Sequence, residues 1–181
     1  IVAHRGVCGG NIPCNSLPAF KAAILAGADM IELDVDRSAD GELFIQHPGM
    51  EYVHLRMQDS IKNYSSTKVE KMRLSNGDLS ETQYPILRLE EALEFLRGKC
   101  LVNIDKFWEN PKEISNLIHK MGMENQVLIK TDYKPEYIDA VEKYAADIPY
   151  MSIARDGLNV HYDLMNRNIR YVGMEALFTS E

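Results

Sequence analysis

Short strand-like segments alternate with helix-like segments along almost the whole chain of 181 residues. This alternation is typical of α/β proteins, in which helices cover a mostly parallel sheet. Seven strands are expected, at residues 1–3, 30–35, 43–46, 101–104, 126–129, 149–153 and 170–174. Capping residues and apolar periodicity predict helices at residues 16–27, 87–97, 110–122, 135–145 and 162–166.

Seven strands with intervening helices are one fewer than the eight of a (β/α)8 TIM barrel. An open, parallel seven-stranded sheet is the alternative. We favour the barrel because residues of functional types follow the carboxyl ends of the strands, where such barrels place their active sites. The chain is then a single barrel domain that lacks its last strand and helix. The polar, irregular segment 50–85, with a short helix near 67–74, is expected to be an insertion over the barrel mouth.

The charge and the hydropathy of the sequence indicate which ligands and surroundings it suits. The formal net charge is −7, whereas a general nucleic-acid binder carries a basic surface. A phosphate ester is still a suitable ligand, because a bound cation reverses the local field. No apolar run approaches the roughly 20 residues that span a bilayer, so we expect no transmembrane segment. The chain begins inside a strand and without methionine, which suggests a missing N-terminal segment and leaves a cytoplasmic or a secreted location open.

Three cysteines, Cys8, Cys14 and Cys100, are too few and odd in number for a disulfide framework. We therefore expect three free thiols. A loop closed by Cys8 and Cys14 is the alternative.

Two carboxylates share one face of the second expected strand. Glu32 and Asp34 are two residues apart, so their side chains point the same way, while the residues between and beside them are apolar. Two adjacent carboxylates are costly to bury without a partner. A hard cation that prefers oxygen ligands, such as Mg²⁺ or Ca²⁺, would satisfy both. The alternative is a solvated face of an edge strand.

Two histidines follow strands. His4 comes directly after the first strand and His47 after the third, and histidine exchanges protons near neutral pH. Twelve residues separate Asp34 from His47, too few to hold both a strand and a helix. Asp40-Gly41 predicts a tight turn within this connection. We expect an extended return that keeps Asp34 and His47 at one mouth, and a hairpin is the alternative.

Charged residues follow the later strands as well. Asp105, after the fourth strand, could be a third carboxylate ligand. The charge of a phosphate could be offset by the neighbouring Lys106, or by Lys130 at the end of the fifth strand. Glu175, at the end of the seventh strand, could orient a base or a substrate hydroxyl.

Together these residues resemble the glycerophosphodiester phosphodiesterase family, whose barrels are of the phospholipase-C-like phosphodiesterase type. The resemblance is strong over residues 1–106 and rests on strand–helix rhythm beyond them. The shared residues are His4-Arg5-Gly6, Asn15-Ser16-Leu17-Pro18-Ala19-Phe20, the segment 27–35, Asp40-Gly41, His47 and the segment 87–93.

The resemblance implies a (β/α)8 barrel and a divalent cation held by Glu32, Asp34 and an acid after the fourth strand. It implies that His4 and His47 act as acid and base on a phosphodiester, and that Arg5 holds the phosphate. The expected reaction is hydrolysis of a small glycerophosphodiester to glycerol 3-phosphate and an alcohol.

Three positions depart from the family pattern. The family usually has Glu at the position of Cys14 and Asp at that of Pro48, and its fourth strand ends in Glu-x-Lys in place of Asp105-Lys106. The shifted lysine favours Lys130 in the phosphate-binding role. Such departures suggest an altered substrate, such as the sphingolipid head group of the related sphingomyelinase D enzymes.

Two other functions are compatible with this sequence. The first is a non-catalytic protein that binds a phosphate ligand on the same barrel, since a fold does not fix a function. The second is a phosphatase or other metal hydrolase on an open sheet, which would need a phosphate-binding glycine loop. The only glycine doublet, Gly9-Gly10, lacks that spacing.

Overall fold

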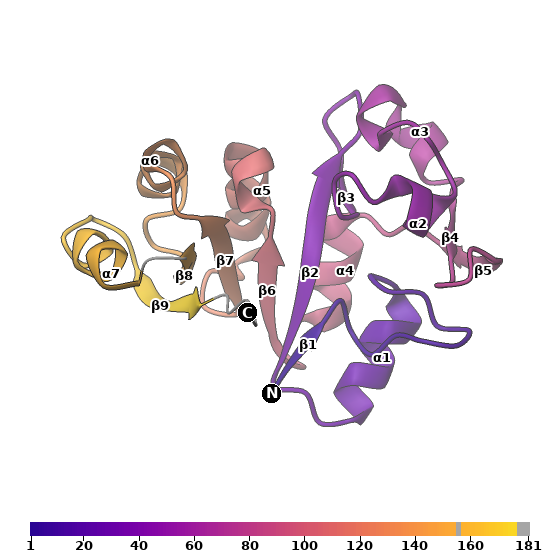
Figure 1. Ribbon diagram of the computed structural model, residues 1–181, viewed down its shortest axis with the longest axis horizontal. Helices are drawn as coiled ribbons and strands as arrows, with labels where there is room; N and C mark the ends of the chain where they lie inside the picture. The colour runs from indigo at the N-terminus through magenta and orange to yellow at the C-terminus, as the bar shows by residue number, and fades with distance from the viewer. Residues whose placement is uncertain (155–156, 177–181) are drawn as a thin grey trace, which may run out of the picture. The chain divides into compact units, whose positions relative to one another are not determined.

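The computed structural model describes residues 1–154 and 157–176, which belong to two compact units, Ile1–Lys106 and Phe107–Glu181 (Figure 1). The strands of the first unit are β1 (Val2–His4), β2 (Met30–Arg37), β3 (Leu43–Ile45), β4 (Arg73–Ser75), β5 (Glu81–Pro85) and β6 (Leu101–Asp105). Its helices are α1 (Leu17–Leu25), α2 (Glu51–Leu55), the 3-10 helix η1 (Ile61–Asn63), α3 (Ser66–Val69) and α4 (Leu89–Leu96).

Three strands of the first unit, β1, β2 and β6, run parallel and side by side, with β2 in the middle. In Figure 1, α1 and α4 lie on one side of β1 and β2. Helix α1 begins after Ser16, whose hydroxyl accepts a hydrogen bond from the backbone N–H of Ala19 at 3.3 Å. Helix α4 buries Leu89, Ala92, Leu93 and Leu96 completely, as their helical spacing predicts.

The connection from β2 to β3 is a hairpin, so the expected extended return is wrong. Strand β3 pairs antiparallel with β2, with Val35 opposite Ile45. The turn between the strands is tight, and the N–H of Gly41 donates to the carbonyl of Ser38 at 3.0 Å. Strand β2 continues three residues beyond Asp34 before it turns, and β3 returns over the same length. His47 therefore comes back beside Asp34 even though the connection is a hairpin.

Residues 50–85 fold around a small apolar core of their own. This insertion contains α2, η1, α3 and an antiparallel pair formed by β4 and β5. The short helix expected near residues 67–74 is found only in part, because α3 ends at Val69 and residues 73–75 form β4. The other elements lie where only irregular structure was expected. The core residues of the insertion and its neighbouring strand are Phe44, Leu55, Ile61, Val69, Leu74 and Ile86. Their spacing is irregular, so no single helical or strand period indicated them.

Cys8 and Cys14 form a disulfide, so the expectation of three free thiols is wrong and the alternative loop is correct. Cys100 takes no part in a disulfide, and partial burial raises the pKa of its thiol. The disulfide closes a short turn in which Gly9 and Ile12 exchange two backbone hydrogen bonds of 2.9 and 3.0 Å. A covalent link between β1 and α1 therefore reinforces a turn that is already hydrogen-bonded.

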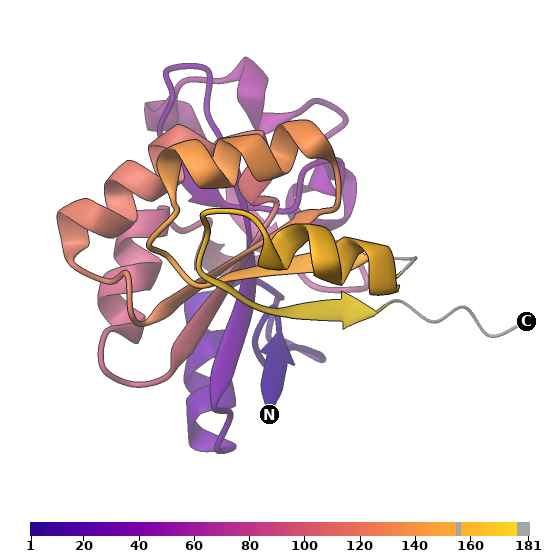
Figure 2. The same cartoon turned by 90° about the vertical axis from the view of Figure 1, so that its left-hand side faces the viewer.

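The second unit contains three parallel strands, in the order β7, β8, β9. Its elements are the 3-10 helix η2 (Phe107–Glu109), α5 (Pro111–Met121), β7 (Val127–Asp132), α6 (Pro135–Tyr144), β8 (Tyr150–Ala154), α7 (Gly157–Met165) and β9 (Tyr171–Ala176). Figure 2 shows α7 beside β9. Proline at the first positions of α5 and α6, and left-handed Gly122 after α5, mark the helix ends as expected. Helix α7 is longer than the expected 162–166.

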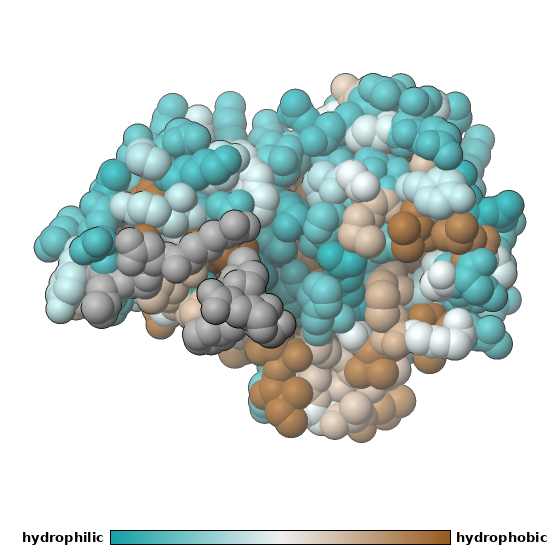
Figure 3. Space-filling view, in the orientation of Figure 1, coloured by the Kyte–Doolittle hydropathy of each residue, from teal (hydrophilic) through white to brown (hydrophobic). Residues whose placement is uncertain are grey.

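All seven expected strands are present, but β3 does not belong to the parallel set. In residues 1–154 and 157–176, no helix combines the length and apolar character of a membrane span. In Figure 3, apolar residues gather over α1 and the start of β1, where Ile1, Val2 and Leu25 are exposed. This patch lies at the amino ends of the parallel strands, whereas the expected site residues follow their carboxyl ends.

Candidate active site

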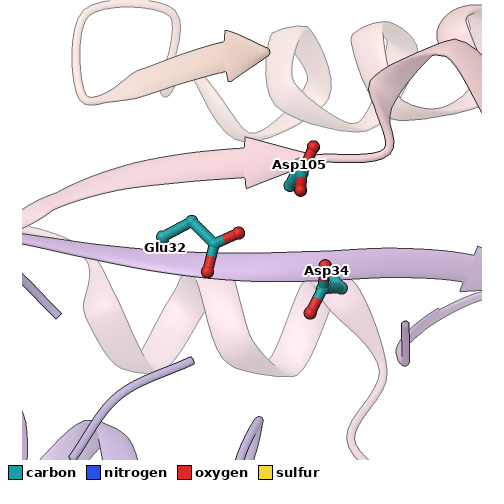
Figure 4. A group of neighbouring side chains, drawn as sticks. All are labelled: Glu32, Asp34 and Asp105. Atoms are coloured by element: carbon teal, nitrogen blue, oxygen red, sulfur yellow. The ribbon is translucent and has the colours of Figure 1, made fainter. Parts of the chain in front are cut away.

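Three buried carboxylates converge where the middle of β2 lies beside the carboxyl end of β6. Glu32, Asp34 and Asp105 each offer an oxygen that lies within 4.8 Å of the others. Figure 4 shows Glu32 and Asp34 on β2 and Asp105 at the end of β6. Alternation puts Glu32 and Asp34 on one face of β2, and the parallel register places Asp34 opposite Asp105. The local sequence of two strands thus builds an all-oxygen cluster.

The donor set of this cluster fits a hard divalent cation. The side chain of Asp34 is completely buried, and its Oδ1 has no hydrogen-bond partner among the described residues. Asn103, two residues before Asp105, also buries an Oδ1 without such a partner. Buried acceptors without donors are costly, and carboxylate and amide oxygens are the ligands that Mg²⁺ and Ca²⁺ prefer. Glu32, Asp34 and Asp105 could therefore hold such an ion.

The loop after β1 supplies two cationic or polar partners of Asp34. Arg5 Nε lies 2.9 Å from Asp34 Oδ2 in an ion pair, and Asn15 Nδ2 donates to the same oxygen at 2.9 Å. The backbone N–H of Arg5 donates to Glu32 Oε2 at 3.1 Å. Arg5 and Asn15 both have positive φ, 57° and 55°, a conformation that bends the loop back over β2. Arg5 was expected at this site, whereas Asn15 was not, although Asn15 lies within the motif shared with the family.

Gly6 allows this loop to approach α1. Its φ is +78°, and a Cβ added there would lie 2.7 Å from the backbone carbonyl carbon of Ala19. The N–H of Val7 also donates to the carbonyl of Ala19 at 3.0 Å. A residue without a side chain is therefore required directly after Arg5.

The two histidines lie beside different carboxylates. His47 Nδ1 donates to the carbonyl of Pro48 at 2.8 Å, and its Nε2 lies 4.0 Å from Asp34 Oδ1. Because Pro48 holds the proton on Nδ1, Nε2 is the nitrogen that can exchange a proton. His4 Nε2 lies 3.8 Å from Glu32 Oε2, and the His4 side chain is 71% exposed. One histidine is thus half-buried and the other is open to water.

Lys106 returns to the cluster although it neighbours Asp105 in sequence. Its φ of 60° turns the chain at the end of β6, and its Nζ lies 3.0 Å from Asp105 Oδ2. The Lys106 backbone N–H also donates to Asp105 Oδ1 at 2.7 Å. The rule that adjacent strand residues point to opposite faces does not apply here, because the strand has ended. Lys106 thus lies where its charge can act on an anionic ligand at Asp105.

Lys130 and Glu175 pair with each other in the second unit. Lys130 Nζ lies 3.0 Å from Glu175 Oε2, and this ion pair joins β7 to β9 across β8. The Lys130 side chain is almost fully buried. A buried lysine is stable when it is paired, so this pair explains why the two charges occur on the strands.

Two further polar residues, Glu51 and His54, lie buried on α2 and were missed by sequence analysis. Burial lowers the pKa of His54 to about 4, with further lowering by the charge of Arg5. Asp34, His47 and Glu51 are the other charges that act on this imidazole. The available signal was their spacing of three residues on a short helix directly after His47.

We compared the chain with known protein families and with curated relatives. The profile of the Glycerophosphoryl diester phosphodiesterase family matches residues 4–180. A glycerophosphodiester phosphodiesterase of Bacillus altitudinis is 31% identical over 140 residues, which cover 72% of this chain and 57% of that protein. One from Caldanaerobacter subterraneus is 35% identical over 103 residues, 53% of this chain and 42% of that protein. The chain thus spans about half the length of these curated relatives.

Solved structures show the fold. A glycerophosphoryl diester phosphodiesterase from Parabacteroides distasonis superposes with a TM-score of 0.81 at 20% identity, covering 95% of this chain and 61% of that one. An Oleispira antarctica phosphodiesterase in complex with sn-glycerol-3-phosphate superposes with a TM-score of 0.70 at 17% identity, covering 97% and 73%. These likenesses support the expected TIM-barrel-like fold. The chain belongs to the glycerophosphoryl diester phosphodiesterase family.

Proposed function

We propose that this protein hydrolyses a glycerophosphodiester to glycerol 3-phosphate and an alcohol, in a reaction that depends on Mg²⁺ or Ca²⁺. The observation that carries the proposal is the cluster of Glu32, Asp34 and Asp105, with His4 and His47 beside it. The family and the relatives' names support the same reaction. The substrate is a small molecule. A nucleic-acid substrate is not expected, because the net charge of the chain is −7.

The metal would be held by Glu32, Asp34 and Asp105, as the fit of their oxygens suggests. A bound divalent cation would polarise the phosphate and offset the charge that develops on its oxygens. Among the side chains of this protein, Arg5 would bind the phosphate, because the loop holds its guanidinium beside Asp34. Lys106 is the second, since its ammonium lies at Asp105.

Proton transfer is assigned to the two histidines. His4 is open to water, so we assign it to the base that activates water or a neighbouring substrate hydroxyl. His47 is half-buried and keeps Nε2 as its exchanging nitrogen, so we assign it to the acid that protonates the leaving alcohol. Lys130 and Glu175 remain proposed substrate-binding residues, and breaking their ion pair would free both charges.

The insertion 50–85 is proposed to cover the mouth of the site. Arg5 Nη1 lies 3.4 Å from the sulfur of Met50, just before α2. Lys62 of η1 lies 3.3 Å from Asp36, two residues beyond Asp34 on β2. Both contacts hold the insertion at the end of β2 that carries the carboxylates.

The test is hydrolysis of glycerophosphocholine, followed by phosphorus NMR to identify glycerol 3-phosphate. Activity is expected with added Mg²⁺ or Ca²⁺ and not with a chelator. His4→Ala and His47→Ala should each lower the rate by at least about a hundredfold, whereas His119→Ala, in the second unit, should leave it unchanged. Full activity of both site variants would refute the assignment.

The same assay distinguishes the alternatives. Binding of glycerophosphocholine without turnover in the presence of either metal would favour a phosphate-ligand binding protein. Turnover of sphingomyelin in preference to glycerophosphocholine would favour an enzyme of the sphingomyelinase D type. The departures at Cys14 and Pro48 motivate this comparison.

A further inference from the structure

The guanidinium of Arg5 is held from two sides. Its Nε lies 2.9 Å from Asp34 Oδ2 in an ion pair. Its Nη1 donates a hydrogen bond to the sulfur of Met50 at 3.4 Å. The Arg5 side chain is 14% exposed, so a ligand can reach it from solvent. Two segments that are far apart in the sequence therefore fix the orientation of the group that we propose to bind the phosphate.

The backbone fixes the position of Met50. Its N–H donates to the carbonyl of His47 at 3.1 Å, and its carbonyl accepts from the N–H of His54 at 2.9 Å. Met50 is therefore held between the turn that follows His47 and the first turn of α2. Its side chain is half-buried and contacts Arg5, whereas Met57 of the same insertion packs against the apolar core.

A thioether suits the task of orienting an arginine without neutralising it. Methionine sulfur is uncharged and accepts hydrogen bonds weakly. A carboxylate at the same place would form a charge-assisted pair with Nη1 and would compete with a phosphate for the guanidinium. Methionine is also flexible, so its sulfur can move aside when a stronger acceptor arrives.

We propose that Met50 is a positioning residue that orients the Arg5 guanidinium toward the phosphate of the substrate. This inference rests on the proposed function, because it assumes a phosphodiester at Arg5. Met50 acts through Arg5 and takes no part in proton transfer. Since the phosphate is bound both before and during the reaction, Met50 should affect KM more than kcat.

The test measures the binding of glycerol 3-phosphate by isothermal titration calorimetry with Mg²⁺, and kcat and KM for glycerophosphocholine. Met50→Leu keeps an apolar side chain of similar size and removes the acceptor. Met50→Gln replaces the sulfur by a neutral amide oxygen that also accepts. Met57→Leu is the matched control, because it makes the same change where the side chain packs against the apolar core. Circular dichroism establishes that each variant is folded.

We expect Met50→Leu to weaken glycerol 3-phosphate binding about fivefold and to raise KM by the same factor, with kcat within about twofold. Met50→Gln and Met57→Leu should both stay within about twofold of the wild type. In an Arg5→Ala protein, adding Met50→Leu should have no further effect on binding, because the two residues act as a unit.

Two results would overturn the proposal. If Met50→Leu equals the wild type while Met50→Gln binds more weakly, Met50 only fills apolar space. If the loss caused by Met50→Leu persists in the Arg5→Ala protein, Met50 does not act through Arg5. The proposed function fails separately if the wild type binds glycerol 3-phosphate but hydrolyses no glycerophosphocholine with Mg²⁺ or Ca²⁺, and the binding data would then still decide the role of Met50. A wild type that does not bind glycerol 3-phosphate would overturn both.

Discussion

Removing the Cys8–Cys14 disulfide is expected to lower the free energy of unfolding by about 2 kcal/mol. The bridge closes a loop with a sequence separation of only six residues. In the chain-entropy description, a cross-link stabilises mainly by restricting the unfolded chain, and a loop this short restricts it least, by about 2 kcal/mol at 25 °C. Asn15 follows Cys14 directly and donates to Asp34. Displacement of Asn15 should therefore also weaken binding of the proposed divalent cation at Asp34.

Urea unfolding followed by circular dichroism measures this difference between wild type and a Cys8→Ser/Cys14→Ser double variant. Treatment of the wild type with a phosphine reductant should reproduce the shift, and Cys100→Ser, which leaves the bridge intact, is the control. A free energy of unfolding that changes by less than about 0.5 kcal/mol would refute the reasoning. It would show that the two hydrogen bonds between Gly9 and Ile12 already order the turn in the unfolded chain.

Three further predictions concern single positions. Gly6→Ala should lower the free energy of unfolding in urea by at least about 2 kcal/mol, because the added Cβ would collide with the backbone of Ala19. Gly41 also has a positive φ but has open space around it, so Gly41→Ala should lower the free energy of unfolding clearly less. Equal losses for the two variants would contradict the steric argument. Hydrogen bonds from two serine hydroxyls and one backbone N–H lower the pKa of Asp40 to about 2. The ionised carboxylate therefore stabilises the fold above pH 4, and this contribution is lost as the pH falls toward 2. In Asp40→Asn, the free energy of unfolding should depend less on pH between 4 and 2. Burial lowers the pKa of His54 to about 4. The folded protein is therefore stabilised above pH 6.5, where His54 is neutral, and it loses about 3 kcal/mol at most as the pH falls toward 4. If the free energy of unfolding of His54→Leu has the same slope against pH between 6.5 and 4 as the wild type, this prediction is contradicted.

The local sequence pattern was sufficient to predict features that depend on a single strand or helix. The alternation of Glu32 and Asp34 put two carboxylates on one face of β2, and the parallel register brought Asp105 beside them. Helix ends were equally readable, because Ser16 and Gly122 mark them through backbone rules that act within one turn.

Sequence pattern failed where contacts are distant or conformations are unusual. The β2–β3 hairpin depends on how far β2 extends past Asp34, and neither propensity nor period encodes that length. Lys106 contacts Asp105 at the end of β6, where it adopts a positive φ, which non-glycine residues rarely do. The core of residues 50–85 joins short elements whose periods are too brief to detect. Helix α2 has only five residues and buries Glu51 and His54 beside Leu55, so no amphipathic period indicated His54.

Two departures from the family pattern lie beside the carboxylate cluster, at Cys14 and Pro48. Cys14, where the family usually has Glu, is bonded to Cys8 and holds Asn15 against Asp34, so a missing carboxylate is accompanied by a stiffer loop. At Pro48, where the family usually has Asp, the group that contacts His47 is the backbone carbonyl, which any residue would supply. This departure therefore removes a carboxylate next to His47 and leaves the hydrogen bond to His47 in place, and neither departure removes an oxygen of the carboxylate cluster. We therefore expect the departures to change which alcohol the protein accepts, because the groups that would act on the phosphate are still present.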